Sequence, residues 1–231
     1  MATVALSRQG VIGCSGTLLG PDVVLTAGHC IGHSPPDTVQ RIDGSTWTVA
    51  RATVHPAFDA TTLAHDVAVV RLSGHAPPPY AEMSPSRDIK AGTLVTVAGV
   101  AAPRALDTYG NFAGTAEVRS LDDVRLTLSP APTTPCGGDS GGSVFLPEDP
   151  PRRLVAVISA GDIDCSRISF ATRVDTEALF IEGARADLPP TGGCIAAGTE
   201  GSTSASSATI VVALTTLLVA ALRVVRGAPE Q

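Results

Sequence analysis

Aromatic residues are scarce in this 231-residue chain, which contains one Trp, two Tyr and five Phe. It also lacks runs of Lys and Arg, regularly spaced aromatics and internal repeats, and its formal net charge is -6. These absences exclude a repeat architecture and argue against nucleic-acid binding, which needs positive charge and base stacking. With 23 Gly and 18 Pro, the composition suits a loop-rich β protein that is long enough to bury a sizeable core.

Short apolar segments, each bounded by Gly, Pro, Asp or Asn, recur along most of the chain. They predict strands at 3–6, 14–18, 23–26, 46–54, 67–72, 94–100, 114–118, 125–128, 143–146, 154–159 and 168–173. Many short strands with frequent turn signals are typical of an all-β sandwich or barrel. The spacing of the strands does not distinguish between these two architectures.

Three motifs contain the residue types of a serine hydrolase. TAGHC occupies 26–30, HDVAVV occupies 65–70 and CGGDSGG occupies 136–142. A serine hydroxyl is a poor nucleophile at neutral pH, so a base must take its proton and a buried carboxylate must hold that base in the right tautomer. The expected roles are base for His29, orienting carboxylate for Asp66 and nucleophile for Ser140.

In this order and setting, the motifs resemble those of the chymotrypsin-like (trypsin-fold) serine proteases, over about residues 3–182. The resemblance implies two six-stranded antiparallel β-barrels with the triad in the cleft between them, and a short helix at about 175–181. It also implies that the backbone N–H groups of Gly138 and Ser140 stabilise the developing oxyanion, a contribution of about 2.7–4 kcal/mol per donor. No cofactor is implied, and no metal site is evident.

The five cysteines give a second test of the resemblance. In the family, the equivalents of Cys14 and Cys30 form a disulfide that ties down the loop of the catalytic histidine, which contributes on the order of 3 kcal/mol. Cys136 and Cys165 match the pair that joins the nucleophile loop to the loop lining the substrate pocket. Two structural disulfides imply an oxidising compartment. Cys194 remains unpaired.

The other candidate residues have no such setting. We interpret His33, His55, His65 and His75 as solvated loop histidines, because they lie in segments rich in Pro, Gly or Ser or beside a strand. Asp22, which follows Gly-Pro, is expected to be a hairpin turn residue.

The resemblance also predicts a substrate pocket. Thr134 would lie at its base, where a trypsin-like enzyme has an aspartate that pairs with Arg or Lys, so cleavage after uncharged, apolar or small side chains is expected. The segment 159–161 matches the family's Ser-Trp-Gly, with Ala160 in place of the tryptophan, and Ser143 replaces the usual proline. The predicted pocket residues are Thr134, Ser159, Gly161 and Ser169.

The composition changes after about residue 187, so we expect a protease domain at 1–187, a Gly/Ser/Thr-rich linker at 188–209 and a hydrophobic segment with a basic end at 210–226. LPPTG at 188–192 matches the sortase motif of Gram-positive surface proteins. The gap of 17 residues between Gly192 and Ile210 is long for that arrangement, so we prefer a myxobacterial sorting tail processed at Cys194, which also explains the odd cysteine. A third possibility is a linker before an ordinary membrane helix. Each places the domain outside the cytoplasmic membrane, at a bacterial cell surface.

The N-terminus departs from the family. An active trypsin-like enzyme begins with a free Ile or Val whose ammonium pairs with the aspartate before the catalytic serine, here Asp139. This chain begins inside the expected first strand and shows no secretory signal, so we expect that its start has been placed too far downstream. Unpaired, Asp139 should be protonated, solvated or rotated away, and in the last two cases the oxyanion hole would be poorly formed.

The sequence therefore predicts a secreted, surface-anchored serine endopeptidase that acts on proteins or peptides, with a sortase-type enzyme as a possible processing partner. The alternative is a catalytically inactive, zymogen-like or pseudoprotease binding module at the surface. The triad motifs favour the enzyme, because a binding scaffold has no physical need for all three residues in their settings.

Overall fold

The computed structural model describes residues 1–32, 35–84, 89–100, 110, 112–147, 153–162 and 164–186. All of them belong to the unit Met1–Gly193, and the second unit, Cys194–Gln231, lies outside the described residues. The predicted linker at 188–209, the hydrophobic segment at 210–226 and Cys194 therefore fall outside the described residues too. In the described ranges, no helix is long and apolar enough to cross a membrane.

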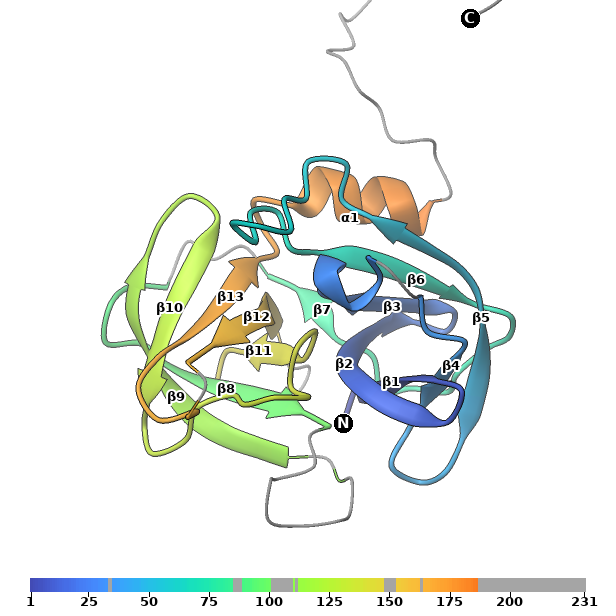
Figure 1. Cartoon of the computed structure of the whole chain (residues 1–231), viewed down its shortest axis with the longest axis horizontal. Coiled ribbons are helices and arrows are strands. Elements are labelled where there is room, and N and C mark those ends of the chain that lie inside the picture. Colours follow the sequence, from blue (N-terminus) through green and yellow to red (C-terminus); the bar gives the residue numbers. More distant parts are fainter. Residues whose placement is uncertain are drawn as a thin grey trace, which may run out of the picture. The chain divides into compact units, whose positions relative to one another are not determined.

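Six antiparallel strands close the first barrel in the order β1-β2-β3-β6-β5-β4 (Figure 1). The chain forms two three-stranded meanders, and the pairings of β1 with β4 and of β3 with β6 join them into a closed sheet. The strands are β1 Thr3–Arg8, β2 Val11–Gly20, β3 Val23–Thr26, β4 Thr38–Gln40, β5 Thr46–Val54 and β6 Ala68–Leu72.

The second barrel has the order β11-β8-β9-β10-β13-β12 and closes through the pairing of β11 with β12. A two-residue strand, β7 (Glu82–Met83), adds to β12 in parallel. The other strands are β8 Leu94–Gly99, β9 Phe112–Leu121, β10 Arg125–Pro130, β11 Ser143–Phe145, β12 Arg153–Gly161 and β13 Ser169–Arg173.

The two barrels share part of their core. Phe145 and Val157 belong to strands of the second barrel, yet both pack in the hydrophobic cluster that fills the first barrel. A buried hydroxyl contact lies beside them, where the Ser143 hydroxyl bonds to Thr17 Oγ1 at 2.6 Å and to Thr3 Oγ1 at 3.2 Å. The side chain that replaces the family's proline therefore links the barrels.

The two-barrel prediction is confirmed, and the structure adds two strands that the sequence did not indicate. Strand β4 follows two prolines and buries only Val39, so its three residues are too short for a visible alternation. The C-terminal helix is present as α1 (Ala178–Arg185), but it begins three residues later than predicted. Residues 174–177 form turns instead, and Glu177 directs its carboxylate to two histidines.

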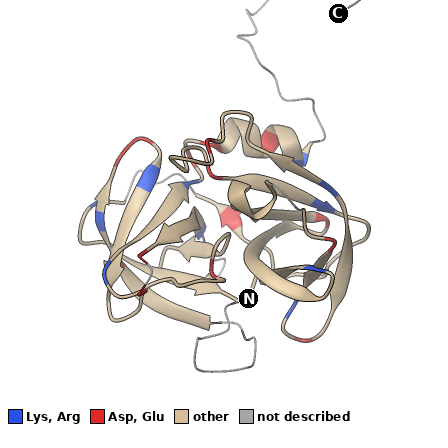
Figure 2. Cartoon of the chain, in the orientation of Figure 1, with Lys and Arg blue, Asp and Glu red and all other residues tan. Residues whose placement is uncertain are grey.

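Charged residues are scattered over the barrels in the view of Figure 2, and neither sign forms a cluster there. This distribution agrees with the low charge content of the sequence.

Candidate active site

His29 and Asp66 meet at one end of the first barrel. His29 lies in a 3₁₀ turn, Gly28–Cys30, directly after β3, and Asp66 lies two residues before β6. Asp66 Oδ1 accepts the backbone N–H of His29 at 2.8 Å, and Oδ2 lies 2.7 Å from His29 Nδ1. A Cβ at Gly28 would lie 3.2 Å from Asp66 Oδ1, so glycine leaves room for this contact.

The carboxylate of Asp66 is fully buried and has a third donor. The hydroxyl of Ser159, on β12 of the second barrel, donates to Asp66 Oδ2 at 2.5 Å. Burial alone would raise the pKa of Asp66, but hydrogen bonds from His29 and Ser159 and the charge of His29 outweigh it and hold the pKa below its usual value. Asp66 is therefore ionised near neutral pH, which assigns the proton of His29 to Nδ1 and leaves Nε2 as the base.

Ser140 lies on the turn that precedes β11. The glycines of this turn are required by space and backbone conformation: Gly138 has φ +94° and Gly141 has φ +81°. A Cβ at Gly141 would come within 2.1 Å of Thr26 Oγ1, so no larger residue fits against the first barrel. The carbonyl of Ser140 accepts the N–H of Ser15 at 2.7 Å, which fixes the turn to β2.

The Cys14–Cys30 disulfide contacts both His29 and Ser140. Cys30 Sγ lies 3.8 Å from His29 Nε2 and 3.7 Å from the carbonyl oxygen of Ser140. The Ser140 hydroxyl donates to the carbonyl of Ser159 at 3.4 Å. Proton transfer to His29 therefore requires the hydroxyl to turn from that carbonyl toward Nε2.

The N–H groups predicted to form the oxyanion hole are free to bind a ligand. In the ranges that the structure describes, neither the N–H of Gly138 nor that of Ser140 donates to a protein acceptor. The carbonyl of Gly138 accepts the Ser15 hydroxyl at 2.9 Å, and Ser15 Oγ accepts the N–H of Val100 at 2.8 Å. Ser15 was not among the predicted site residues, because a serine after a cysteine has no sequence signature for this role.

The side chain of Asp139 packs against Gly99, the last residue of β8. Its Oδ2 accepts the N–H of Cys136 at 2.9 Å, whereas its buried Oδ1 has no hydrogen-bond partner in the described part of the chain. Burial raises the pKa of Asp139 and the Cys136 hydrogen bond opposes that shift. Of the three states expected for Asp139, this environment favours the protonated one.

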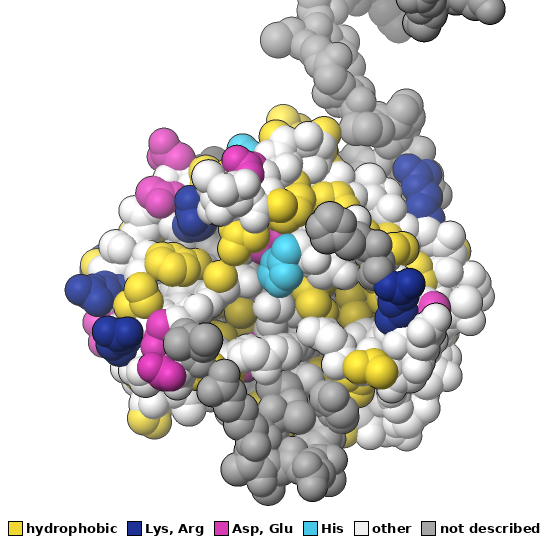
Figure 3. Space-filling view, in the orientation of Figure 1, with side chains coloured by type: hydrophobic (Ala, Val, Ile, Leu, Met, Phe, Trp, Pro, Cys, Tyr) yellow, Lys and Arg dark blue, Asp and Glu magenta, His cyan; other side chains and the backbone are white. Residues whose placement is uncertain are grey.

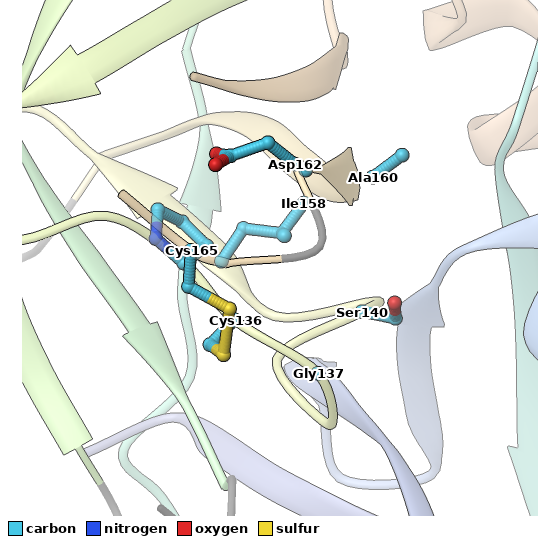
Figure 4. A pocket seen from close by; sticks show the side chains of 9 residues that line it. Cys136, Gly137, Ser140, Ile158, Ala160, Asp162 and Cys165 are labelled. Atoms are coloured by element: carbon cyan, nitrogen blue, oxygen red, sulfur yellow. A yellow bond between two sulfur atoms is a disulfide. The ribbon is translucent and has the colours of Figure 1, made fainter. Parts of the chain in front are cut away.

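A cavity of about 210 Å³ opens beside Ser140. The Cys136–Cys165 disulfide forms one side, and Ala160 and Gly161 lie at the end of β12 (Figure 4). Of the four predicted pocket residues, only Gly161 lines this cavity. The hydroxyls of Thr134 and Ser169 are buried without a partner among the described residues, and Ser159 is engaged with Asp66.

Asp162 also lines this cavity, and the sequence reasoning did not anticipate it. Its carboxylate accepts the backbone N–H groups of Ile168, Arg167 and Ser166, which together lower the pKa of Asp162 to about 2. In Figure 4 this carboxylate is directed away from Ser140. Asp162 therefore organises the loop 162–168.

A second cavity, of about 290 Å³, is lined by His29. Its lining includes Arg8, Val11 and the Cys14–Cys30 disulfide. Figure 3 shows a histidine side chain near the middle of the molecular face, with an acidic side chain beside it and hydrophobic side chains nearby. Ser140 thus lines the first cavity, and His29 lines the second.

The two expected disulfides are present, with Cα–Cα separations of 6.1 Å for Cys14–Cys30 and 5.1 Å for Cys136–Cys165. Asp22 lies in the β2–β3 turn as expected and pairs with Arg71 at 2.8 Å.

Two of the remaining histidines are not the solvated loop residues that the sequence indicated. His55 and His65 each bond to Glu177, so that prediction is wrong for these two. Burial lowers the pKa of His55, the charge of Glu177 raises it, and His65 lowers it further, with a net decrease. His75 is exposed, and His33 lies outside the described residues.

The fold and the geometry of this site define a chymotrypsin-like serine protease scaffold, and the comparisons agree. The family model described as Trypsin matches residues 1–181, and the chain therefore belongs to the trypsin family.

Human serine protease 56 is 32% identical over 193 residues, a match that covers 69% of this chain and 32% of the human protein. Trypsin alpha of Drosophila melanogaster is 30% identical over 101 residues, covering 40% of this chain and 37% of the fly protein. The matches thus span about a third of the length of these relatives. The VesB protease of Vibrio cholerae shares the fold, with a TM-score of 0.67 and 19% identity over 80% of this chain and 64% of VesB.

The buried Asp139 makes a prediction about stability. Its folded pKa lies above the unfolded value near 3.8, so the folded state binds more protons and stability falls as pH rises from 3.8 through the folded pKa. Asp139→Asn removes this loss, since it cannot ionise. We expect the variant to be more stable than wild type at pH 7 and to gain less near pH 4, measured by urea unfolding.

Asp123→Asn, at an exposed position, serves as the matched control and should change neither value. If Asp139→Asn instead loses stability relative to wild type as the pH rises from 4 to 7, the raised pKa of the Asp139 carboxyl is contradicted.

Proposed function

We propose that the chain is a serine endopeptidase that cleaves peptide bonds through an acyl-enzyme intermediate. The observation that carries this proposal is the hydrogen-bonded series from Ser159 through Asp66 to His29, with Ser140 beside it on a glycine turn at the edge of a cavity. A binding module would not need a buried ionised carboxylate that holds one histidine tautomer.

The reaction follows from these positions. Ser140 Oγ attacks the scissile carbonyl carbon while His29 Nε2 takes its proton, and ionised Asp66 stabilises the imidazolium. The N–H groups of Gly138 and Ser140 bind the oxyanion. His29 then gives its proton to the leaving amine as the C–N bond breaks, and water, activated by His29, hydrolyses the acyl-serine ester to release the acid and restore Ser140.

The proposal predicts graded losses of activity. Ser140→Ala should abolish labelling by a fluorophosphonate probe and lower kcat on a peptide amide by about 10⁶-fold. Ser159→Ala should keep the label but lower kcat by about 10- to 100-fold, because it removes a hydrogen bond to a buried carboxylate. Rates are measured on the folded, oxidised full chain, with Ser129→Ala on β10 as the control hydroxyl.

A correctly folded chain that neither reacts with the probe nor hydrolyses any peptide would reject the enzyme. It would favour the surface binding module instead. Two observations would then become relevant: the Ser140 hydroxyl already donates to the Ser159 carbonyl, and Asp139 Oδ1 lacks a partner in the described ranges.

We further propose that the enzyme cleaves after uncharged side chains. Thr134, at the expected pocket base, carries no charge, and Asp162 uses its carboxylate on the N–H groups of its own loop. We expect Ala- and Phe-type peptide amides to be hydrolysed with higher kcat/KM than the Arg-type amide. An Arg preference that Asp162→Asn removes would instead assign the selectivity to Asp162.

The tail supports a proposal of surface anchoring on its sequence alone, from the small-residue linker at 188–209, the apolar segment at 210–226 and the odd Cys194. We expect the full chain expressed in a bacterium to sediment with the membrane or envelope fraction, whereas a chain that ends at residue 187 does not. Cys194→Ser should abolish retention if the cysteine is the processing point, and Thr191→Ala if LPPTG is. Equal release of the full and shortened chains would reject anchoring.

A further inference from the structure

Three ligating side chains meet behind the catalytic carboxylate, in a cluster that the proposed reaction does not use. His55 follows β5, His65 directly precedes Asp66, and Glu177 immediately precedes α1. Glu177 Oε2 lies 3.2 Å from His55 Nε2, and Oε1 lies 2.9 Å from His65 Nδ1. The two imidazole rings stack with centroids 4.8 Å apart.

The donor set suits a transition-metal cation. Two imidazoles and one carboxylate are frequent ligands of Zn²⁺, and a tetrahedral ion with bonds of about 2.0–2.1 Å separates its ligand atoms by about 3.3 Å. The two nitrogen-to-oxygen separations are 3.2 and 2.9 Å, and all three ligand atoms lie within 4.8 Å of one another. Because the two imidazole rings are stacked, an ion enters when the rings turn so that both nitrogen atoms face it and approach to about 3.3 Å.

The surroundings fix the ligands and leave one direction open. The Glu177 side chain is only 3% exposed, and Phe180 on α1 packs edge-on against the His55 ring. The His65 side chain is 36% exposed, so a water molecule can reach the fourth position of an ion held there. Three protein ligands and one open position are the usual arrangement of an accessible zinc site.

We propose that His55, His65 and Glu177 form a binding site for Zn²⁺ or a similar imidazole-seeking divalent cation. The cation takes His55 Nε2, His65 Nδ1 and a Glu177 oxygen in place of the two nitrogen-to-carboxylate hydrogen bonds. Each ring proton moves through solvent to the other nitrogen of its imidazole. At His55 this replaces the exposed contact in which Ala57 N–H donates to Nδ1 at 3.1 Å, and that N–H turns to water.

A second group of potential ligands, which contains two cysteines, cannot form such a site. Cys14, His29 and Cys30 also lie close together, but both sulfurs are in the Cys14–Cys30 disulfide and offer no thiolate. The cluster at Glu177 is thus the better site in the described ranges.

A cation bound at this site would affect the triad directly, because its ligand His65 and the triad residue Asp66 are joined by one peptide bond. His65 has φ +52°, and its carbonyl accepts the N–H of Val67 at 2.8 Å, so Asp66 is held in a tight turn between them. A cation that draws His65 toward Glu177 displaces Asp66 from His29. If the chain has the proposed activity, Zn²⁺ therefore lowers kcat, and this effect rests on the proposed function, whereas binding itself does not.

Calorimetric titration of the folded full chain with Zn²⁺ tests the site without reference to activity. Cys194→Ser is the background, because a free thiol also binds zinc. We expect one equivalent bound at this site and a raised Tm, with binding weakened by at least about tenfold in His55→Gln and in His65→Gln. His75→Gln, an exposed histidine after β6, is the matched control and should bind as the background does.

Mg²⁺ and Ca²⁺ prefer oxygen ligands and should not compete at equal concentration. A Tm in EDTA equal to that of the background shows that a variant is folded. If His55→Gln does not fold, His65→Gln decides the test, because His65 is the more exposed of the two histidines. The absence of Zn²⁺ binding, binding that survives both substitutions, or binding lost only in His29→Gln would each overturn the proposal. Zinc binding without peptidase activity would keep the site and reject only the enzyme.

Discussion

The burial of the Asp66 carboxylate is the constraint on which the rest of the site depends. An ionised carboxylate without solvent is stable only if donors surround it, and here the donors are His29 N–H, His29 Nδ1–H and the Ser159 hydroxyl. Two of these come from the first barrel and the third comes from the second. The ionised state of Asp66 therefore requires the barrels to stay in register to within the length of a hydrogen bond.

Hydroxyl groups, rather than charges, maintain this register. Ser143 on β11 bonds to Thr17 on β2 inside the shared core. Ser15, also on β2, holds the turn of the nucleophile through both its backbone N–H and its side chain. Buried hydroxyls can satisfy one another with a smaller desolvation cost than ion pairs, so the interface between the barrels remains mostly apolar and still directional.

The features that could be predicted from the sequence lie in short continuous motifs, whereas contacts between residues far apart in the chain were missed. The sequence motifs contain His29, Asp66 and Ser140. The pairing of the cysteines and the number of barrels followed from the family that these motifs resemble. Ser15 could not be predicted as a support of the Gly138 carbonyl, because its partners are more than a hundred residues away in the chain and a hydroxyl has no characteristic spacing. The same reason explains why the hydrogen bond from Ser159 to Asp66 was not predicted.

The connection between β5 and β6 contributes residues both to the triad and to the cluster of His55, His65 and Glu177. His65 and Asp66 are consecutive, but their side chains reach different groups, Glu177 in one case and His29 in the other. Helix α1 begins at Ala178. The preceding residue, Glu177, is only 3% exposed and bonds to His55 and His65. The start of α1 is thus linked to His29 through Glu177, His65 and Asp66, and the last contact in this series is 2.7 Å long. The packing of α1 against β6 therefore contributes to the geometry of the site as well as to the stability of the barrel.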